Sequence, residues 1–405
     1  MTLVVMLAYR SARKLLSPLV FLSGLSFKLL CGVLVGLLYQ YHYDGGDTFY
    51  YYQQALIYVQ RDDFWRSVTE TVLISDPVRA IWFSRCVAVL IYVTHADYWL
   101  CAIYFSVFSF LGVCYAVCKL TIWLPSLRLA SIIALFYFPS TVFWSSGLLK
   151  ESLAFAAVFI IVGFYAGLQS GPKRRWYDYM LLSCALGVLI VLKYYIAALL
   201  LPALVFVWVY HWSENRMFAT WPFWLKSGML AAAMLLPVWF FLHSLSYNFS
   251  WEKFSVVIQS NHLFILSETH AANRLPVIHV TDTVLDDVIN VLYFAFSGLF
   301  RPLIGESFYF PFWLSSVENT FLLIGAIGIF KRKVFIPPNL KPEILAMLAY
   351  VILCALFLSY SVPNLGTIAR YKVYYLPFLV MLIVGFRSRI DSSNDEVQNK
   401  KHNTK

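Results

Sequence analysis

Apolar runs of about twenty residues, separated by short polar links, are the feature that most constrains this chain. A helix that crosses a bilayer needs roughly 20 mostly apolar residues. The segments that meet this requirement are 16 to 38, 98 to 118, 129 to 145, 152 to 169, 177 to 193, 195 to 211, 223 to 243, 311 to 330, 343 to 361 and 372 to 386. With 60% hydrophobic and only 13% charged residues, the sequence predicts an all-α polytopic membrane protein.

Basic clusters between these runs predict the orientation of the helices, because cytoplasmic links carry an excess of Lys and Arg. The clusters are Arg10/Arg13/Lys14, Lys119/Arg128, Lys173/Arg174/Arg175, Lys331/Arg332/Lys333 and Arg387/Arg389. They share one side only if two shorter runs, 80 to 94 and 288 to 304, do not cross the membrane. We therefore expect about ten transmembrane helices, both termini inside, and interfacial or re-entrant helices in two external loops, 41 to 97 and 244 to 310.

Residues 1 to 389 are expected to form a single transmembrane domain, followed by a disordered cytoplasmic tail at 390 to 405. The formal charge is +10, but no basic face is long enough to follow a phosphate backbone, so no nucleic acid partner is expected. The cytoplasmic links contain neither a P-loop nor a GxGxxG motif. The seven cysteines lie in apolar runs without metal-ligand spacing.

An acidic turn follows the first apolar run, in the stretch YHYDGGDTFYYY at residues 41 to 52. Its carboxylates, Asp44 and Asp47, flank a Gly-Gly pair that permits positive φ. One interpretation is structural: an Asp caps an interfacial helix that starts near Thr48. The other is catalytic: one carboxylate is a base at the rim of an apolar cavity. Tyr50 and its neighbouring tyrosines fit both, because such rings anchor at membrane interfaces and also stack on sugars.

Lys150 and Glu151 stand together in the stretch FWSSGLLKES, at residues 143 to 152. Ionisable groups at a helix start within a membrane are costly, so they need a partner or water. In the structural interpretation, Glu151 favours the helix N-terminus through the dipole. In the functional interpretation, Lys150 holds an anionic phosphate and Glu151 orients it or an acceptor hydroxyl.

Four further cations lie near predicted outer helix ends or in an external loop: Lys193, Arg301, Arg370 and Lys372. Lys193 and Lys372 can instead extend to lipid headgroups. Arg370 is the strongest candidate of the four, because a guanidinium binds a phosphate in two-point geometry. Together these cations would neutralise a phosphate or pyrophosphate leaving group.

The order of these turns resembles the GT-C superfamily of membrane glycosyltransferases. The resemblance is carried by the acidic first loop, the Ser-Ser-Gly…Lys-Glu turn and the Leu-Lys-Tyr-Tyr turn. The later segments FRPLIGE, VEN and NLGTIARYK are similar to those of bacterial lipid-linked glycan polymerases. The resemblance implies a polyprenyl-phosphate or polyprenyl-pyrophosphate donor in the outer leaflet and an acceptor hydroxyl on a saccharide, lipid or protein.

By the same resemblance, the first-loop acid deprotonates the acceptor and the anomeric carbon is inverted. Asp47 is our first choice for this base, with Asp44 as its partner or a sugar ligand. Many members of the family have an Asp where this chain has Lys150-Glu151, so a divalent metal stays possible without being required.

The resemblance, together with the predicted topology, implies a glycosyltransferase or glycan polymerase in a bacterial inner membrane, with its active site on the non-cytoplasmic face. The alternative is a transporter or flippase for a lipid-linked or anionic solute, which would place charges through the depth of the membrane. A structural subunit of an envelope complex is a third possibility.

Overall fold

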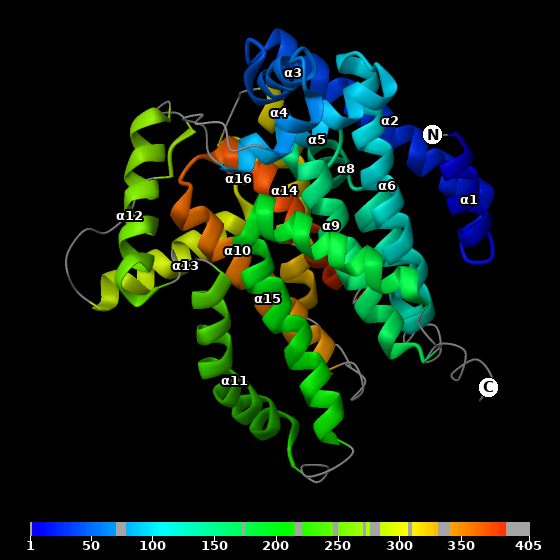
Figure 1. Ribbon diagram of the computed structural model, residues 1–405. Coiled ribbons are helices and arrows are strands. Elements are labelled where there is room, and N and C mark those ends of the chain that lie inside the picture. Colours follow the sequence, from blue (N-terminus) through cyan, green and yellow to red (C-terminus); the bar gives the residue numbers. More distant parts are fainter. Residues whose placement is uncertain are drawn as a thin grey trace. The chain divides into compact units, whose positions relative to one another are not determined.

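The computed structural model describes residues 2–69, 78–171, 175–214, 221–245, 250–269, 273–275, 284–306, 310–330 and 341–385. The described residues are predominantly helical (Figure 1). They divide into two compact units, Met1–Tyr194 (unit 1) and Tyr195–Lys405 (unit 2). The predicted tail at 390 to 405 lies outside the described residues.

Unit 1 runs from the N-terminal helix to the interruption of α10. Its elements are α1 (Thr2–Ala12), α2 (Pro18–Tyr41), α3 (Gly46–Val59), α4 (Phe64–Thr69), α5 (Val78–Thr94), α6 (Tyr98–Trp123), η1 (Pro125–Leu127), α7 (Arg128–Ile132), the π-helix η2 (Ile133–Tyr137), α8 (Pro139–Trp144), α9 (Lys150–Gln169) and the first part of α10 (Trp176–Glu214). Unit 2 continues with the rest of α10, α11 (Phe223–Leu245), α12 (Trp251–Glu268), α13 (Val284–Phe300), α14 (Phe310–Phe330), α15 (Lys341–Ser361), α16 (Leu365–Tyr371), η6 (Lys372–Tyr374) and a last helix at Leu376–Gly385.

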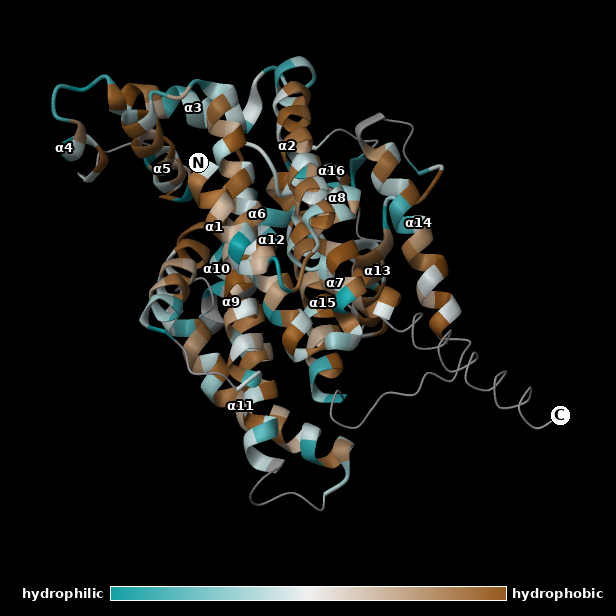
Figure 2. Ribbon diagram, turned by 90° about the vertical axis from the view of Figure 1, so that its right-hand side faces the viewer, coloured by the Kyte–Doolittle hydropathy of each residue, from teal (hydrophilic) through white to brown (hydrophobic). Residues whose placement is uncertain are grey.

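Seven described helices are long and apolar enough to cross a membrane: α2, α6, α9, α10, α11, α14 and α15. The segments Leu365–Tyr374 and Leu376–Gly385 meet at 66° and make an eighth if they form one broken span. Hydrophobic residues dominate the long helices in Figure 2, and many hydrophilic residues lie near helix ends and connections. The expected all-α chain with several candidate spans is confirmed, and the number ten stays a prediction.

The difference in number arises mainly at two places. The apolar run 129 to 145 is divided among α7, η2 and α8, because Pro139 has no N–H to continue the preceding helix. The runs 177 to 193 and 195 to 211 are joined in α10, which departs from helical geometry at Lys193 (φ −146°, ψ 57°). The two shorter runs form α5 and α13, each of 17 residues. Whether these two cross the membrane stays a prediction.

Small residues bring α6 and α9 together in the core of unit 1. A methyl group added at Gly112 would lie 2.9 Å from Cβ of Ala156, and one added at Gly163 would lie 2.9 Å from Cα of Ala116. Small residues at such positions let helix backbones approach closely, which is how helices associate in a bilayer without a hydrophobic driving force. Helix α9 is consequently the most buried of the candidate spans.

The acidic turn joins α2 to α3 through three residues with positive φ: Asp44 (48°), Gly45 (92°) and Gly46 (41°). The N–H of Gly45 donates to the carbonyl of Tyr39, which closes the end of α2. Helix α3 then packs on α5, where the rings of Tyr51 and Phe83 meet edge to face with centroids 5.0 Å apart. The expected helix after the acidic turn is therefore present, beginning at Gly46.

In unit 2, part of the predicted external loop 244 to 310 packs on α15 and α16. Phe294 of α13 is fully buried in a cluster with Leu365 and Ile368 of α16. The hydroxyl of Ser359 donates to the carbonyl of Phe294 at 2.6 Å, and Nδ1 of His262 lies 2.6 Å from the carbonyl oxygen of Tyr360. These contacts attach α12 and α13 to the long helix α15.

Candidate functional site

A break between α8 and α9 brings backbone polar groups into the interior of unit 1. Gly147 has φ 73° there, and its N–H donates to the hydroxyl of Ser106 on α6 at 2.9 Å. A methyl group at Gly147 would lie 3.1 Å from the carbonyl oxygen of Gly32 on α2. Both the positive φ and the close approach favour glycine, so the Ser-Ser-Gly stretch ends one helix and allows the next to start inside the bundle.

The break lies well below the end of α2. It contacts Gly32 and Val35, whereas α2 continues to Tyr41. At about 1.5 Å per residue, six to nine residues correspond to roughly 9 to 14 Å along the helix. Helix α9 therefore presents its first residues, Lys150 and Glu151, inside unit 1 and not at the tip of α2.

Lys150 is half-buried at the first position of α9 and faces helix α3. Its ammonium lies 4.7 Å from the centre of the ring of Tyr51, within the range of a cation–π contact. The contact joins two regions that the sequence analysis had singled out separately, the first-loop helix and the Lys-Glu turn. It leaves the cation near the surface of a buried aromatic ring.

Glu151 and Lys193 form a buried ion pair, with Oε1 and Nζ 2.9 Å apart and side chains 1% and 3% exposed. Glu151 also lies in the first turn of α9, where the helix dipole favours a carboxylate. Lys193 reaches it from the point where α10 departs from helical geometry. The predicted Glu151 and Lys193 are thus brought together, as partners of each other.

Asp47 lies in the first turn of α3, half-buried and one helical turn before Tyr51. Residues four apart share a helix face, so Asp47 lies on the face of α3 that contacts Lys150. Asp44 is exposed in the turn itself. The N-cap of α3 is Gly45, which has no side chain to cap the helix, so the expected cap by an Asp is not seen there. Tyr50 is half-buried, with its ring 5.8 Å from that of Tyr51.

Lys28 is a buried cation that the sequence reasoning did not single out. It is 3% exposed in the middle of α2, donates to the hydroxyl of Ser145 at 2.5 Å, and lies 5.3 Å from the ring centre of Phe155. The signal was present in the sequence, because a single Lys inside a spanning run is costly and needs a reason. Its contact with Ser145 adds a third lysine to the surroundings of the α8–α9 break.

In unit 2, Lys372 is fully buried and bound by oxygen atoms. Its ammonium donates to the carbonyls of Leu299 (3.2 Å) and Arg301 (2.8 Å) and to Oδ1 of Asn319 (3.2 Å). An ammonium has three donors. A direct bond from Lys372 to a substrate would have to replace one of these contacts.

Arg301 and Arg370 are the other predicted cations of unit 2. Arg301 donates to Glu306 at 3.0 Å and to the hydroxyl of Tyr293 at 2.7 Å. Burial acts to lower the pKa of Arg301, but the contacts with Glu306 and Tyr293 outweigh it and raise that pKa above its usual value. Arg370 is half-buried in α16, with its guanidinium 5.3 Å from the ring centre of Tyr371.

Within the part of the chain that the structure describes, no group of three or more His, Cys, Asp or Glu side chains is arranged to hold a metal ion.

Comparison with protein-family models, curated proteins and solved structures gives no match to this chain. The fold and the buried charges together define a class, an all-helical multi-pass membrane protein with ionisable groups at a helix break inside the bundle.

Proposed function

We propose that this protein is a GT-C-like glycosyltransferase or glycan polymerase. It would transfer a sugar or oligosaccharide from a polyprenyl-phosphate or polyprenyl-pyrophosphate donor to an acceptor hydroxyl, with inversion at the anomeric carbon. The site would lie on the non-cytoplasmic face of a bacterial inner membrane. One observation carries the proposal: helix α3, which bears Asp47, is in contact through Tyr51 with Lys150 at the start of α9.

The chemistry requires a base and a cation, and unit 1 provides both on facing elements. The carboxylate of Asp47 takes the proton of the acceptor hydroxyl while that oxygen bonds to the anomeric carbon. The bond from that carbon to the phosphate oxygen breaks, and the phosphate leaves with the bonding electron pair. Lys150 neutralises the negative charge that develops on the leaving oxygen.

The Glu151–Lys193 pair has a positioning role in this proposal. A buried ion pair holds the first turn of α9 against the interrupted helix α10, so the backbone of Lys150 is fixed. Asp44, exposed in the preceding turn, is assigned to sugar binding, as is Tyr50 beside Tyr51. All the residues to which the proposal gives a role lie in unit 1. It gives no role to Arg370 in unit 2.

The test uses purified full-length protein in nanodiscs, a panel of polyprenyl-phosphate-linked and polyprenyl-pyrophosphate-linked hexoses, and an oligosaccharide acceptor. Product is measured by mass spectrometry for the wild type, Asp47→Asn and Asp44→Asn. Loss of a general base lowers turnover by about 10²-fold or more. We expect that loss in Asp47→Asn and a change of only a few-fold in the matched Asp44→Asn, and full turnover in both variants would eliminate the base assignment.

The placement on one face is tested separately with reporter fusions after residues 80 and 300. External readings at both positions agree with the proposed topology. Cytoplasmic readings at both would remove the argument that the acidic turn and the Lys-Glu turn share the non-cytoplasmic face.

A transporter or flippase for a lipid-linked or anionic solute is the second candidate, and Lys28 favours it. Lys28 lies ten residues after Pro18 and thirteen before Tyr41, so its charge sits at mid-depth of a spanning helix. Intramembrane cations commonly mark transport paths. Liposomes with a fluorescent polyprenyl-phosphate sugar would decide between the two: translocation without acceptor, abolished by Lys28→Met, supports transport, and no translocation by the wild type excludes it for this solute.

A further inference from the structure

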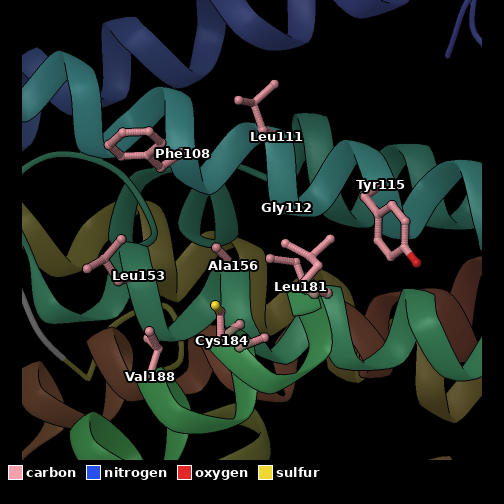
Figure 3. A pocket seen from close by; sticks show the side chains of 12 residues that line it. Phe108, Leu111, Gly112, Tyr115, Leu153, Ala156, Leu181, Cys184 and Val188 are labelled. Carbon is pink, nitrogen blue, oxygen red and sulfur yellow. The ribbon is translucent and has the colours of Figure 1, made fainter. Parts of the chain in front are cut away.

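An apolar groove in unit 1 runs along α6, α9 and the first part of α10 (Figure 3). Its volume is about 340 Å³. Phe108, Leu153 and Val188 lie toward one end, Tyr115 lies toward the other, and Ala156 and Cys184 lie between them. Each of the three helices thus follows the groove lengthwise.

The groove has a closed floor and an open side. Its floor is made by small buried residues such as Ala156, which is 6% exposed. Phe108 on α6 is 41% exposed and Cys184 on α10 is exposed, so the groove opens between these two helices. Both helices are candidate spans, so the open side faces hydrocarbon if they cross the membrane.

One end of the groove is polar and carries residue types that are typical of a membrane interface. The first turn of α10 exposes Trp176 (75%), Tyr177 (43%) and Tyr179 (52%), the aromatic residues that gather at headgroup depth. Beside them, the hydroxyl of Tyr115 donates to Asp178 at 3.4 Å. This bond ties α6 to α10 where the groove ends.

Two cations flank this polar end. Lys119 follows Tyr115 by one turn of α6, and its ammonium lies 5.4 Å from the ring centre of Tyr115. Arg175 directly precedes α10, is exposed, and donates to the hydroxyl of Tyr177 at 3.0 Å. Asp178 also lies here, but it is buried and accepts from Tyr115 and from the backbone N–H of Arg175. The solvent-facing charge at this end is therefore positive.

The length of the groove fits one leaflet. Phe108 and Lys119 are eleven residues apart on α6, which corresponds to roughly 16 Å at 1.5 Å per residue. Half of a hydrocarbon core about 30 Å thick is about 15 Å. A single acyl chain whose headgroup lies at Lys119 would therefore reach Phe108.

From this geometry we infer that unit 1 carries a binding site for an anionic glycerophospholipid of the bilayer. One acyl chain lies in the groove between α6, α9 and α10, and its phosphate lies between Lys119 and Arg175. Basic groups between helices on the cytoplasmic side are known to hold anionic headgroups. The headgroup end of the site, at Tyr115 and Lys119, is the end away from Lys150, whereas Leu153 at the apolar end follows Lys150 by one turn of α9. The inference goes beyond the proposed sugar transfer, because that reaction assigns no part to the groove or to its two cations.

The experiment places purified full-length protein in nanodiscs of phosphatidylcholine with a small fraction of phosphatidylglycerol, and counts retained lipids by native mass spectrometry. Cys184→Trp fills the groove, and Lys119→Gln/Arg175→Gln removes the cations. Matched controls are Cys86→Trp, at an exposed cysteine of α5, and Arg10→Gln/Arg13→Gln, with the same loss of charge in α1 and directly after it. Thermal unfolding in lipid-free detergent checks that each variant is folded.

We expect about a tenfold lower retention of phosphatidylglycerol in both site variants and an unchanged value in both controls, where tenfold corresponds to about 1.4 kcal/mol. Equal retention of phosphatidylcholine by the wild type would overturn the inference, because a neutral headgroup would then suffice. Wild-type retention in folded Cys184→Trp would eliminate the groove, and in folded Lys119→Gln/Arg175→Gln it would eliminate the headgroup site. Equal losses in the controls would show non-specific binding and also overturn it.

Discussion

Lys193 in unit 1 and Lys372 in unit 2 are both buried beside a break in a helix, but their partners differ. The ammonium of Lys193 pairs with the carboxylate of Glu151 at 2.9 Å. Lys372 donates to three neutral oxygens, two of them backbone carbonyls around the bend near Arg301. A carboxylate neutralises a buried ammonium. Carbonyl oxygens do not neutralise it, but by accepting its hydrogen bonds they are held at fixed positions, and the backbone with them. We therefore expect the Lys193 contact to act mainly through charge, and the Lys372 contacts to act mainly through hydrogen bonds to the backbone.

Lys150 adds the third case, because its ammonium contacts the face of an aromatic ring and is only half-buried. A cation–π contact at such a site is worth about 0.5 to 1 kcal/mol. Of the three lysines, Lys150 is the most exposed, and for that reason we expect it to be the one that a ligand reaches.

The largest effect is expected from breaking the ion pair in unit 1. Glu151→Gln leaves a buried ammonium without its charge partner, which costs about 3 to 5 kcal/mol in free energy of unfolding. The double variant Glu151→Gln/Lys193→Met removes both charges and is expected to recover at least half of that loss. Unfolding in mixed detergent micelles measures both values. A double variant as unstable as the single one would mean that the two residues are not energetically coupled.

The next effect concerns activity more than stability. Lys150→Gln is expected to lower sugar transfer by about 10² to 10³-fold, because it removes a charge that stabilises the leaving phosphate. Loss of the cation–π contact with Tyr51 should lower its unfolding free energy by about 0.5 to 1 kcal/mol. Lys14→Gln, at an exposed position, is the control and should transfer sugar at the wild-type rate. A Lys150→Gln variant with normal turnover would rule out the phosphate role.

Lys372→Met should show the opposite balance. Three buried oxygens lose their donor, which costs about 1 to 3 kcal/mol in free energy of unfolding. The protein that remains folded should keep its turnover rate. Lys341→Met, whose ammonium lies 5.6 Å from the ring centre of Phe223, is the control in the same unit. Full stability with lost turnover would restore Lys372 as a substrate-binding residue, as the sequence predicted.

The smallest effect is expected at Arg301 and Glu306, whose side chains are 20% and 30% exposed. Partly exposed pairs contribute no more than about 1 kcal/mol. Glu306→Gln should therefore lower the unfolding free energy by less than about 1 kcal/mol, and less still at high salt because ions screen the pair. A larger loss would mean that the Arg301–Glu306 pair contributes as a buried ion pair does. The difference between this pair and Glu151–Lys193 would then be smaller than we infer.

The sequence by itself determined the class of the molecule and the places where polar groups interrupt it. The predicted runs 16 to 38 and 152 to 169 became α2 and α9 within three residues at each end. Prediction of these helices from the sequence succeeds because a bilayer imposes a local rule. Each spanning segment must be apolar and must form all its backbone hydrogen bonds within itself. Glycines in the acidic turn and in the Ser-Ser-Gly stretch marked true breaks for the same local reason.

Only the tertiary structure decided which of those groups meet. Glu151 and Lys193 are 42 positions apart, and Lys28 and Ser145 are 117 apart, so no periodicity relates them. Their pairing depends on how closely the helices approach, which is set by small residues such as Gly112 against Ala156. The run 129 to 145 failed to form one helix because a proline and the packing around it outweighed its apolar composition. Hydropathy depends only on neighbouring residues in the sequence, whereas the pairing of charges depends on contacts between helices that are distant in the sequence.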